Sequence, residues 1–401
     1  MKTFTRYQRK ILISCFLVYL FTYVGRLNLS ATLSDIISEL SIDSARGGLI
    51  QSLFAVSYAA GQLLFGFMAD KMEPKRLMIC GLLGSALSNL LFSVMRSYGL
   101  LLAMWTVNGI FQSMIWTPIV LVMTRTFEEK QRKSASLVMS FTLAAGHFAA
   151  WALAMWLAQR FTWRLSYRIP ALVLAVASVI AIVNLPGKLR SVDESRHGEA
   201  KASAPIKALF GTGLVMLLLC CAANGFVRDG VITWAPTILT GDADGSSMLF
   251  SLVIPCINLF GIVLGAYLVR HVKGSIRRLI GLMMGGVALP AVVLFAVKAS
   301  PVYLMAILLG MMSAILYGTN PLLTTLVPMQ YDSFGRVGLV AGLIDCFIYL
   351  GSSLAGTFTG LMHDLSGGTW GNAYVLWAIV SILGCALGIL ASRHKISNSE
   401  D

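Results

Sequence analysis

The sequence contains few charged residues. Asp, Glu, Lys and Arg make up only 12% of its 401 residues, whereas hydrophobic residues make up 57%. Soluble domains carry about 25% charged residues. A soluble protein of this composition would lack the polar side chains needed to cover its surface. Long apolar runs with few charges are typical of membrane-spanning helices, so the composition predicts an integral membrane protein.

Motifs that enzymes and ATP-driven pumps use are also missing. No GxxxxGK[ST] phosphate-binding loop occurs, so the sequence does not support ATP-driven transport. Neither a metal-ligand spacing nor a nucleophile–base arrangement is present. We therefore expect a protein that is not an enzyme and that uses no cofactor and no metal. The cysteines lie inside apolar runs, and we interpret them as small buried residues: Cys15, Cys80, Cys220, Cys221, Cys256, Cys346 and Cys385.

The apolar runs are long enough to cross a bilayer, which requires about 20 mostly apolar residues in a helix. Twelve such runs occur, at 11–31, 47–68, 77–95, 99–123, 135–157, 169–186, 208–228, 247–269, 279–297, 301–323, 337–361 and 372–391. The fold class that they predict is an all-α polytopic membrane protein with twelve transmembrane helices.

The basic residues indicate an orientation. When the N-terminus is placed in the cytoplasm, most Lys and Arg residues fall in cytoplasmic loops, as the positive-inside rule requires. The external loop that carries Arg160, Arg164 and Arg168 fits poorly. The net charge of +13 therefore reflects loop charges, and no nucleic-acid-binding motif accompanies it. We expect a monomeric, multi-pass protein of the plasma membrane with both termini in the cytoplasm.

A polar segment divides the apolar runs into two groups of six. Residues 188–206 are charged and poor in large apolar side chains, which is typical of a cytoplasmic linker. We expect an N-terminal six-helix bundle at 1–187 and a C-terminal six-helix bundle at 207–401, related by pseudo-symmetry. Transporters built from such repeats hold their substrates at the interface between the repeats, near the bilayer midplane.

Three ionisable residues lie inside the predicted spans, where charge is costly and usually functional: Arg26, Arg228 and Asp345. Tyr19, Tyr23 and Arg26 have the spacing of one helical face, so they predict an anion-binding wall. The planar guanidinium matches phosphate or carboxylate. The two arginines occupy matching positions in the two halves. Alternatively, both side chains extend to the outer interface from near the helix ends.

Asp345 has two interpretations. In the functional interpretation it pairs with an arginine or carries a coupling proton. In the structural interpretation it is a partly hydrated acid, or the span is placed wrongly. Asp229 follows Arg228 but faces another direction on a helix, and we interpret it as a loop residue. Uncharged polar residues also occur inside the spans, and hydrogen bonds between helices explain most of them: Gln62, Asn108, Gln112, His147, Asn258 and Asn320.

The loop after the second run carries a small motif made of Gly66, Asp70, Lys71, Lys75 and Arg76. An acid beside basic residues at helix ends suits a conformational latch. The stretch resembles the loop motif of the major facilitator superfamily.

A narrower resemblance covers nearly the whole chain. The sequence is similar to the organophosphate:phosphate antiporter family, which includes glycerol-3-phosphate and hexose-phosphate transporters. The matching motifs are Tyr19-x-x-x-Tyr23-x-x-Arg26-x-Asn28, Gly109-x-Phe111-Gln112-x-Met114-x-Trp116-x-Pro118, Arg228-x-Gly230-x-x-x-Trp234-x-Pro236-Thr237, Tyr317-Gly318, Pro328, Ala341-Gly342 and Tyr349-Leu350-Gly351-x-Ser353.

The resemblance implies roles for particular residues. In that family the arginines of helices 1 and 7 bind the phosphate group, which implies this role for Arg26 and Arg228. Tyr19, Tyr23 and Tyr58 match tyrosines that line the site. Tyr317 and Asn320 join Asp345 and His147 as candidates for substrate contact or ion coupling. The family implies rocker-type alternating access and exchange of an organic phosphate for inorganic phosphate.

The sequence departs from the family at several positions. Gln62, which we expect to bind the substrate with the arginines and tyrosines, stands where lysine is common in the glycerol-phosphate branch. Asp345 stands where glycine is common. Leu27 replaces a lysine after the first arginine, and His147 lies about three residues late. Two alternatives therefore remain. One is a proton-coupled symporter of a sugar acid or another organic anion. The other is a phosphate-ester sensor that transports little.

Overall fold

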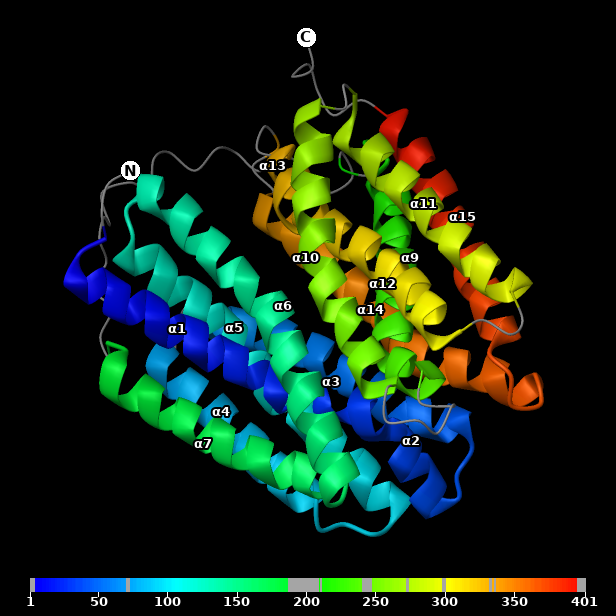
Figure 1. Cartoon of the computed structure of the whole chain (residues 1–401). Helices are drawn as coiled ribbons and strands as arrows, with labels where there is room; N and C mark the ends of the chain where they lie inside the picture. Colours follow the sequence, from blue (N-terminus) through cyan, green and yellow to red (C-terminus); the bar gives the residue numbers. More distant parts are fainter. Residues whose placement is uncertain are drawn as a thin grey trace. The chain divides into compact units, whose positions relative to one another are not determined.

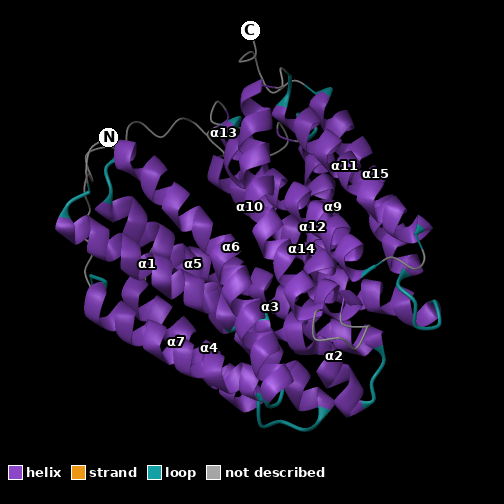
Figure 2. Ribbon diagram, in the orientation of Figure 1, coloured by secondary structure: helices purple, strands orange, loops and turns teal. Residues whose placement is uncertain are grey.

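The computed structural model describes residues 4–69, 73–186, 209, 211–239, 247–271, 274–297, 301–331, 334 and 337–394. Within these ranges the chain forms helices joined by short turns and loops, without a strand (Figure 2). The helices are α1 (Arg6–Val24), α2 (Asn28–Leu40), α3 (Ser44–Ala69), α4 (Pro74–Phe92), α5 (Tyr98–Thr126), α6 (Glu129–Arg160), α7 (Leu165–Asn184), α9 (Leu214–Leu239), α10 (Ser247–His271), α11 (Ile276–Ala296), α12 (Val302–Pro321), the π-helix η2 (Leu322–Leu326), α13 (Val327–Met329), α14 (Val337–Leu365) and α15 (Gly371–Ser392).

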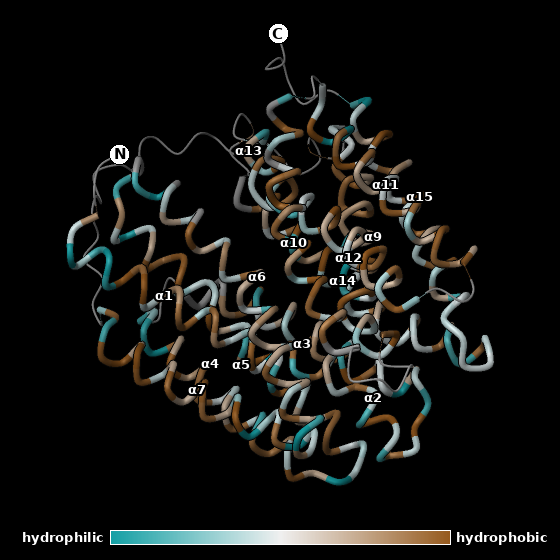
Figure 3. The backbone as a smooth tube through the Cα atoms, viewed as in Figure 1, coloured by the Kyte–Doolittle hydropathy of each residue, from teal (hydrophilic) through white to brown (hydrophobic). Residues whose placement is uncertain are grey.

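Twelve segments of the described chain are long and apolar enough to cross a membrane. The predicted all-α architecture with twelve transmembrane helices is therefore confirmed. Hydrophobic residues run along the helices, and hydrophilic residues gather mainly near helix ends and loops (Figure 3). The first segment combines α1 and α2, and the tenth combines α12, η2 and α13.

The chain divides into two compact units. One comprises residues 1–42 and 53–196, and the other comprises residues 43–52 and 197–401. The first turns of α3 thus belong with the C-terminal helices, although the rest of α3 belongs with the N-terminal ones. The predicted linker 188–206 lies within 187–208, outside the described residues.

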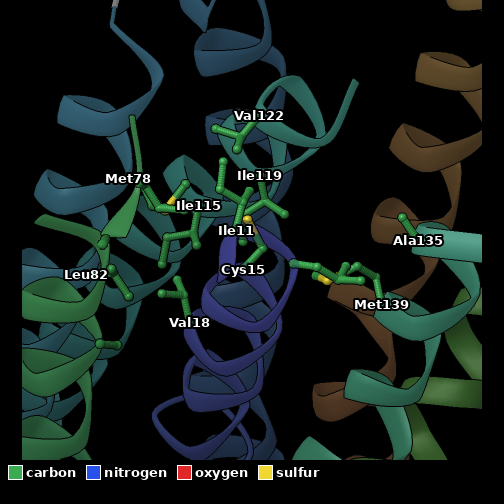
Figure 4. Close-up of a cluster of buried hydrophobic side chains, with 14 of the residues drawn as sticks. Ile11, Cys15, Val18, Met78, Leu82, Ile115, Ile119, Val122, Ala135 and Met139 are labelled. Carbon is green, nitrogen blue, oxygen red and sulfur yellow. The ribbon is translucent and has the colours of Figure 1, made fainter. Parts of the chain in front are cut away.

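The N-terminal unit has its apolar core around α1. Ile11, Cys15 and Val18 project from α1 toward side chains of α4 and α5, including Leu82 and Ile119 (Figure 4). Cys15 is buried there as predicted, and so are Cys220 and Cys221 in the other unit. Cys80 and Cys256 are instead exposed, so the prediction was wrong for them. Apolar runs bury only one face of a membrane helix against its neighbours, and the remaining faces meet lipid.

The first membrane span is broken, contrary to the continuous helix predicted over 11–31. Helix α1 ends at Val24 and α2 begins at Asn28. Hydropathy averaged over a long apolar run does not detect a break of three residues, Gly25, Arg26 and Leu27. Gly25 caps α1, and a Cβ there would lie 2.5 Å from the Cδ1 atom of Leu174. A larger residue at position 25 would therefore require the Leu174 side chain to move.

The C-terminal unit consists of helix pairs that lie side by side: α9 with α14, α10 with α12, and α11 with α15 (Figure 1). Small residues permit this approach, because a Cβ on Gly351 would lie 1.8 Å from the carbonyl oxygen of Ala222. Helix α9 continues to Leu239, whereas the predicted span ended at Arg228. The residues after Asp229 are apolar enough to extend the helix, and Pro236 lies within it.

The first turns of α3 are fixed to the end of α14. The two carboxylate oxygens of Asp364 accept hydrogen bonds from the backbone N–H groups of Ser44, at 3.1 Å, and Ala45, at 2.8 Å. The Oγ atom of Ser44 lies 3.0 Å from Nδ1 of His363. A carboxylate at this position satisfies N–H groups that have no partner within the helix and complements the helix dipole.

Candidate functional site

The N-terminal unit gathers aromatic side chains around Arg26. The guanidinium carbon lies 4.8 Å from the ring centre of Tyr23 and 5.5 Å from that of Tyr58. The rings of Tyr19 and Tyr23 meet edge to face at 5.3 Å, and Trp116 contacts Tyr19 at 4.5 Å. The structure therefore brings Tyr19, Tyr23 and Arg26 together, although the helix breaks before Arg26. These cation–π contacts hold the guanidinium of Arg26 against the tyrosine rings.

Gln62 orients one of these tyrosines. Its Nε2 atom donates a hydrogen bond to the hydroxyl of Tyr58 at 2.8 Å, and its Oε1 atom accepts one from Thr117 at 3.5 Å. Because the Tyr58 oxygen accepts this bond, its own proton is directed elsewhere. Gln62 thus belongs to the same cluster as Arg26, without adding the charge that a lysine would supply.

Arg228 in the C-terminal unit is held by an acid. Its Nε and Nη2 atoms donate to the two carboxylate oxygens of Asp229 at 2.8 and 3.4 Å, and Nη1 lies 3.5 Å from Oδ1 of Asn320. The interpretation of Asp229 as a loop residue was wrong. Neighbouring residues on a helix point about 100° apart, but a long arginine side chain can turn back to reach its neighbour. No sequence signal other than adjacency indicated the pair.

Helix α12 ends beside this arginine. Asn320 is followed by Pro321 and by the π-helical turn η2, a type of irregularity that often marks functional positions. Tyr317, one turn earlier, and Tyr349 of α14 both interact electrostatically with Arg228. Tyr317 and Asn320, both predicted from the sequence, therefore lie around Arg228 within the C-terminal unit.

Asp345 is an exposed residue of α14 and interacts electrostatically with Arg228. It shares its face of the helix with Tyr349, whereas the exposed Leu350 and Leu354 lie on a different face, about 140° around the axis. The C-terminal unit therefore places two carboxylates near one guanidinium. The cluster around Arg26 contains no acid among the side chains described above.

His147 is a buried residue of α6 that contacts a tryptophan one turn later. It is 1% exposed in α6, and its ring meets that of Trp151 edge to face at 4.3 Å. Trp151 in turn donates to the hydroxyl of Ser30 at 2.9 Å. These contacts fit packing between α6 and α2, and the coupling role of His147 stays a prediction.

The described part of the predicted latch forms local contacts. Lys75 donates to the carbonyl of Ile182 at 2.6 Å, and Arg76 pairs with Glu73 at 2.7 Å. Asp70 and Lys71 lie outside the described residues, and of Gly66 only its place in α3 is described. Sequence reasoning missed Glu73, although an acid directly before Pro74 is a common start of a helix.

Comparison with known proteins identifies the class. The chain matches the Major Facilitator Superfamily over residues 15–355, and it belongs to that family. It is therefore a transport protein and not an enzyme. A structure of a bacterial homologue of the lysosomal transporter Spinster aligns with a TM-score of 0.77 and 16% identity over 98% of both chains, which shows the shared fold.

The similar curated sequences carry related names. A probable hexose phosphate transport protein of Chlamydia pneumoniae is 22% identical over 96% of this chain and 90% of its own length. The glycerol-3-phosphate transporter of Bacillus subtilis is 23% identical over 96% of this chain and 92% of its own length. A probable hexose phosphate transport protein of Chlamydia trachomatis is 28% identical, but that match covers 33% of this chain and 29% of the relative. The resemblance drawn from the sequence motifs is confirmed at this level.

Proposed function

We propose that this protein is a secondary transporter that exchanges an organic phosphate for inorganic phosphate by alternating access. The observation that carries the proposal is the cluster of Arg26 with Tyr19, Tyr23 and Tyr58 in the N-terminal unit. A guanidinium supported by phenol rings offers several N–H and O–H donors to a phosphate group. The names of the relatives that align over most of their length agree with this substrate class.

The proposal also assigns a role to the arginine of the C-terminal unit. Arg228 supplies a second guanidinium that Asp229 and Asn320 hold in place. An incoming phosphate competes with these two side chains for the N–H groups of Arg228. We infer that Arg228 exchanges its protein partners for substrate during the cycle.

The experiment is a substrate screen with purified protein in phosphate-loaded liposomes. Labelled phosphate is exchanged against a panel of phosphate esters and sugar acids. We expect phosphate esters to drive efflux of the internal label and sugar acids to have no effect. Failure of every phosphate ester would contradict the proposal.

A second candidate function is proton-coupled symport of an organic anion such as a sugar acid. The observation that favours it is the pair of carboxylates, Asp229 and Asp345, near Arg228. An acid near the substrate arginine is suited to carry a coupling proton. Liposomes without internal phosphate but with an imposed pH gradient separate the two functions, because only a symporter accumulates the anion there.

We further propose that the protein resides in the plasma membrane with both termini in the cytoplasm. The basic loops support this orientation. Arg164 belongs to the external loop that fits the charge rule poorly, and it is paired with Glu39 at 2.7 Å. The carboxylate of Glu39, at the end of α2, therefore offsets the positive charge of Arg164.

A further inference from the structure

The break between α1 and α2 removes backbone hydrogen bonds inside a membrane span. Gly25, Arg26 and Leu27 lie between the two helices. The N–H groups of Arg26 and Leu27 both bond to the carbonyl of Tyr23, at 3.1 and 2.9 Å. In a bilayer, a backbone carbonyl that loses its helical partner must find another donor within the protein.

Two asparagine side chains supply that donor. The Nδ2 atoms of Asn89, in α4, and Asn108, in α5, each lie 3.1 Å from the carbonyl oxygen of Gly25. Gln112, one turn after Asn108, reaches the carbonyl of Thr22 at 3.3 Å. The last turn of α1 is therefore bonded from two neighbouring helices.

These amides also hold one another. Asn28 donates to Asn89 at 3.0 Å, while Ser85 donates to Asn108 at 2.6 Å and accepts from Gln112 at 2.8 Å. All five side chains are buried: Gln112 is 3% exposed, and the other four are 0% exposed, namely Asn28, Ser85, Asn89 and Asn108. We call Asn28, Ser85, Asn89, Asn108 and Gln112 the amide network. A buried network of this kind fixes one geometry, because a lost bond leaves a polar group unsatisfied.

The helix that carries Arg228 in the C-terminal unit has no such break. Arg228 lies within the unbroken helix α9, and its side chain is held by Asp229. The asparagine one turn earlier, Asn224, is equally buried but donates to the hydroxyl of Thr319 at 2.7 Å rather than to a broken backbone. The amide network is thus tied to the placement of Arg26.

We propose that Asn89 and Asn108 are positioning residues for substrate recognition, because they fix the helix break that presents Arg26 to the anion. The identity of the bound anion rests on the proposed function. The positioning of the helix break by Asn89 and Asn108 rests only on the hydrogen bonds. Neither asparagine contacts the substrate. Together with Gln112 they set the position of the arginine backbone.

The test uses the full-length Asn108→Leu protein, with Asn224→Leu as the matched control. Amide hydrogen exchange followed by mass spectrometry reports the backbone over residues 22–28 without any substrate. We expect faster exchange there in Asn108→Leu and unchanged exchange in Asn224→Leu. If Asn108→Leu does not assemble in the membrane, Asn108→Ala removes the same donor without adding bulk. Unchanged exchange over residues 22–28 would overturn the positioning role.

Phosphate exchange in liposomes supplies the functional readout. We expect the half-saturating phosphate concentration to rise about five- to tenfold in Asn108→Leu, the effect of one buried hydrogen bond. The maximal rate should stay within about twofold of the original protein, because the loss falls on binding. An unchanged half-saturating concentration would overturn the proposal. A wild-type protein without phosphate exchange would refute the proposed function instead, and the hydrogen-exchange result would still decide the positioning role.

Discussion

At the scale of single residues, the two arginines differ in their surroundings. Arg26 contacts the rings of Tyr23 and Tyr58, whereas Arg228 is paired with Asp229 and interacts with Asp345. An anion therefore meets unequal electrostatic fields at the two positions. If Arg228 binds phosphate as proposed, the acids near it weaken that attraction, and removing one of them should strengthen it.

The change Asp345→Asn tests this imbalance. We expect the half-saturating phosphate concentration to fall about two- to fivefold, as for one charge that water partly screens. The control is Asp345→Glu, which keeps the charge and should behave as the original protein does. A loss of all transport in Asp345→Asn together with loss of its pH dependence would instead favour proton-coupled symport.

Much of the residue-scale picture was predictable. Charges inside apolar runs are rare, so Arg26, Arg228 and Asp345 stood out from hydropathy alone. The sequence did not predict every partner of Arg228. Helical periodicity predicts that Asp229 and Arg228 face different directions. It takes no account of the length of an arginine side chain, which reaches Asp229 in the structure.

At the scale of the elements, short polar contacts decide where helices begin and bend. Asp364 accepts two backbone hydrogen bonds from the start of α3, and the amide network bonds the break after α1. Neither contact follows from hydropathy, because each joins residues far apart in the sequence. Asn108 and Gln112 were expected to form hydrogen bonds between helices, and this is confirmed, but the carbonyls that they bond were not predictable.

Removal of the carboxylate at the start of α3 should destabilise the protein. We expect Asp364→Ala to cost about 1 kcal/mol, the usual effect of losing a helix N-terminal cap. Asp364→Asn should cost less, since its amide oxygen still accepts one N–H. The midpoint of thermal unfolding of the purified protein in detergent measures both.

The matched control is Thr369→Ala. This side chain is exposed and bonds only to the nearby carbonyl of Ser366 at 3.2 Å. Its unfolding midpoint should not change. Equal midpoints for Asp364→Ala and the unmodified protein would show that the contact between α3 and α14 contributes no stability.

At the scale of the whole molecule, composition and hydropathy predicted the class. Twelve apolar runs were predicted, and the described parts of the chain contain twelve segments able to cross a membrane. The chain belongs to the Major Facilitator Superfamily. The boundary between halves was harder to predict. The first turns of α3 group with the C-terminal unit, because Asp364 and the close approach of Gly48 to Gly356 join them to α14. Hydropathy contains no information about such packing.

The central claim is that exchange of phosphate depends on one arginine in each unit. The most direct measurement compares phosphate exchange in liposomes for the original protein, Arg26→Lys and Arg228→Lys at equal amounts of inserted protein. Lysine keeps the charge but loses the planar fork of N–H groups. We expect exchange to fall about 10- to 100-fold or more in each variant, the effect of losing a charge-assisted hydrogen bond. Normal phosphate exchange in either variant would contradict the account.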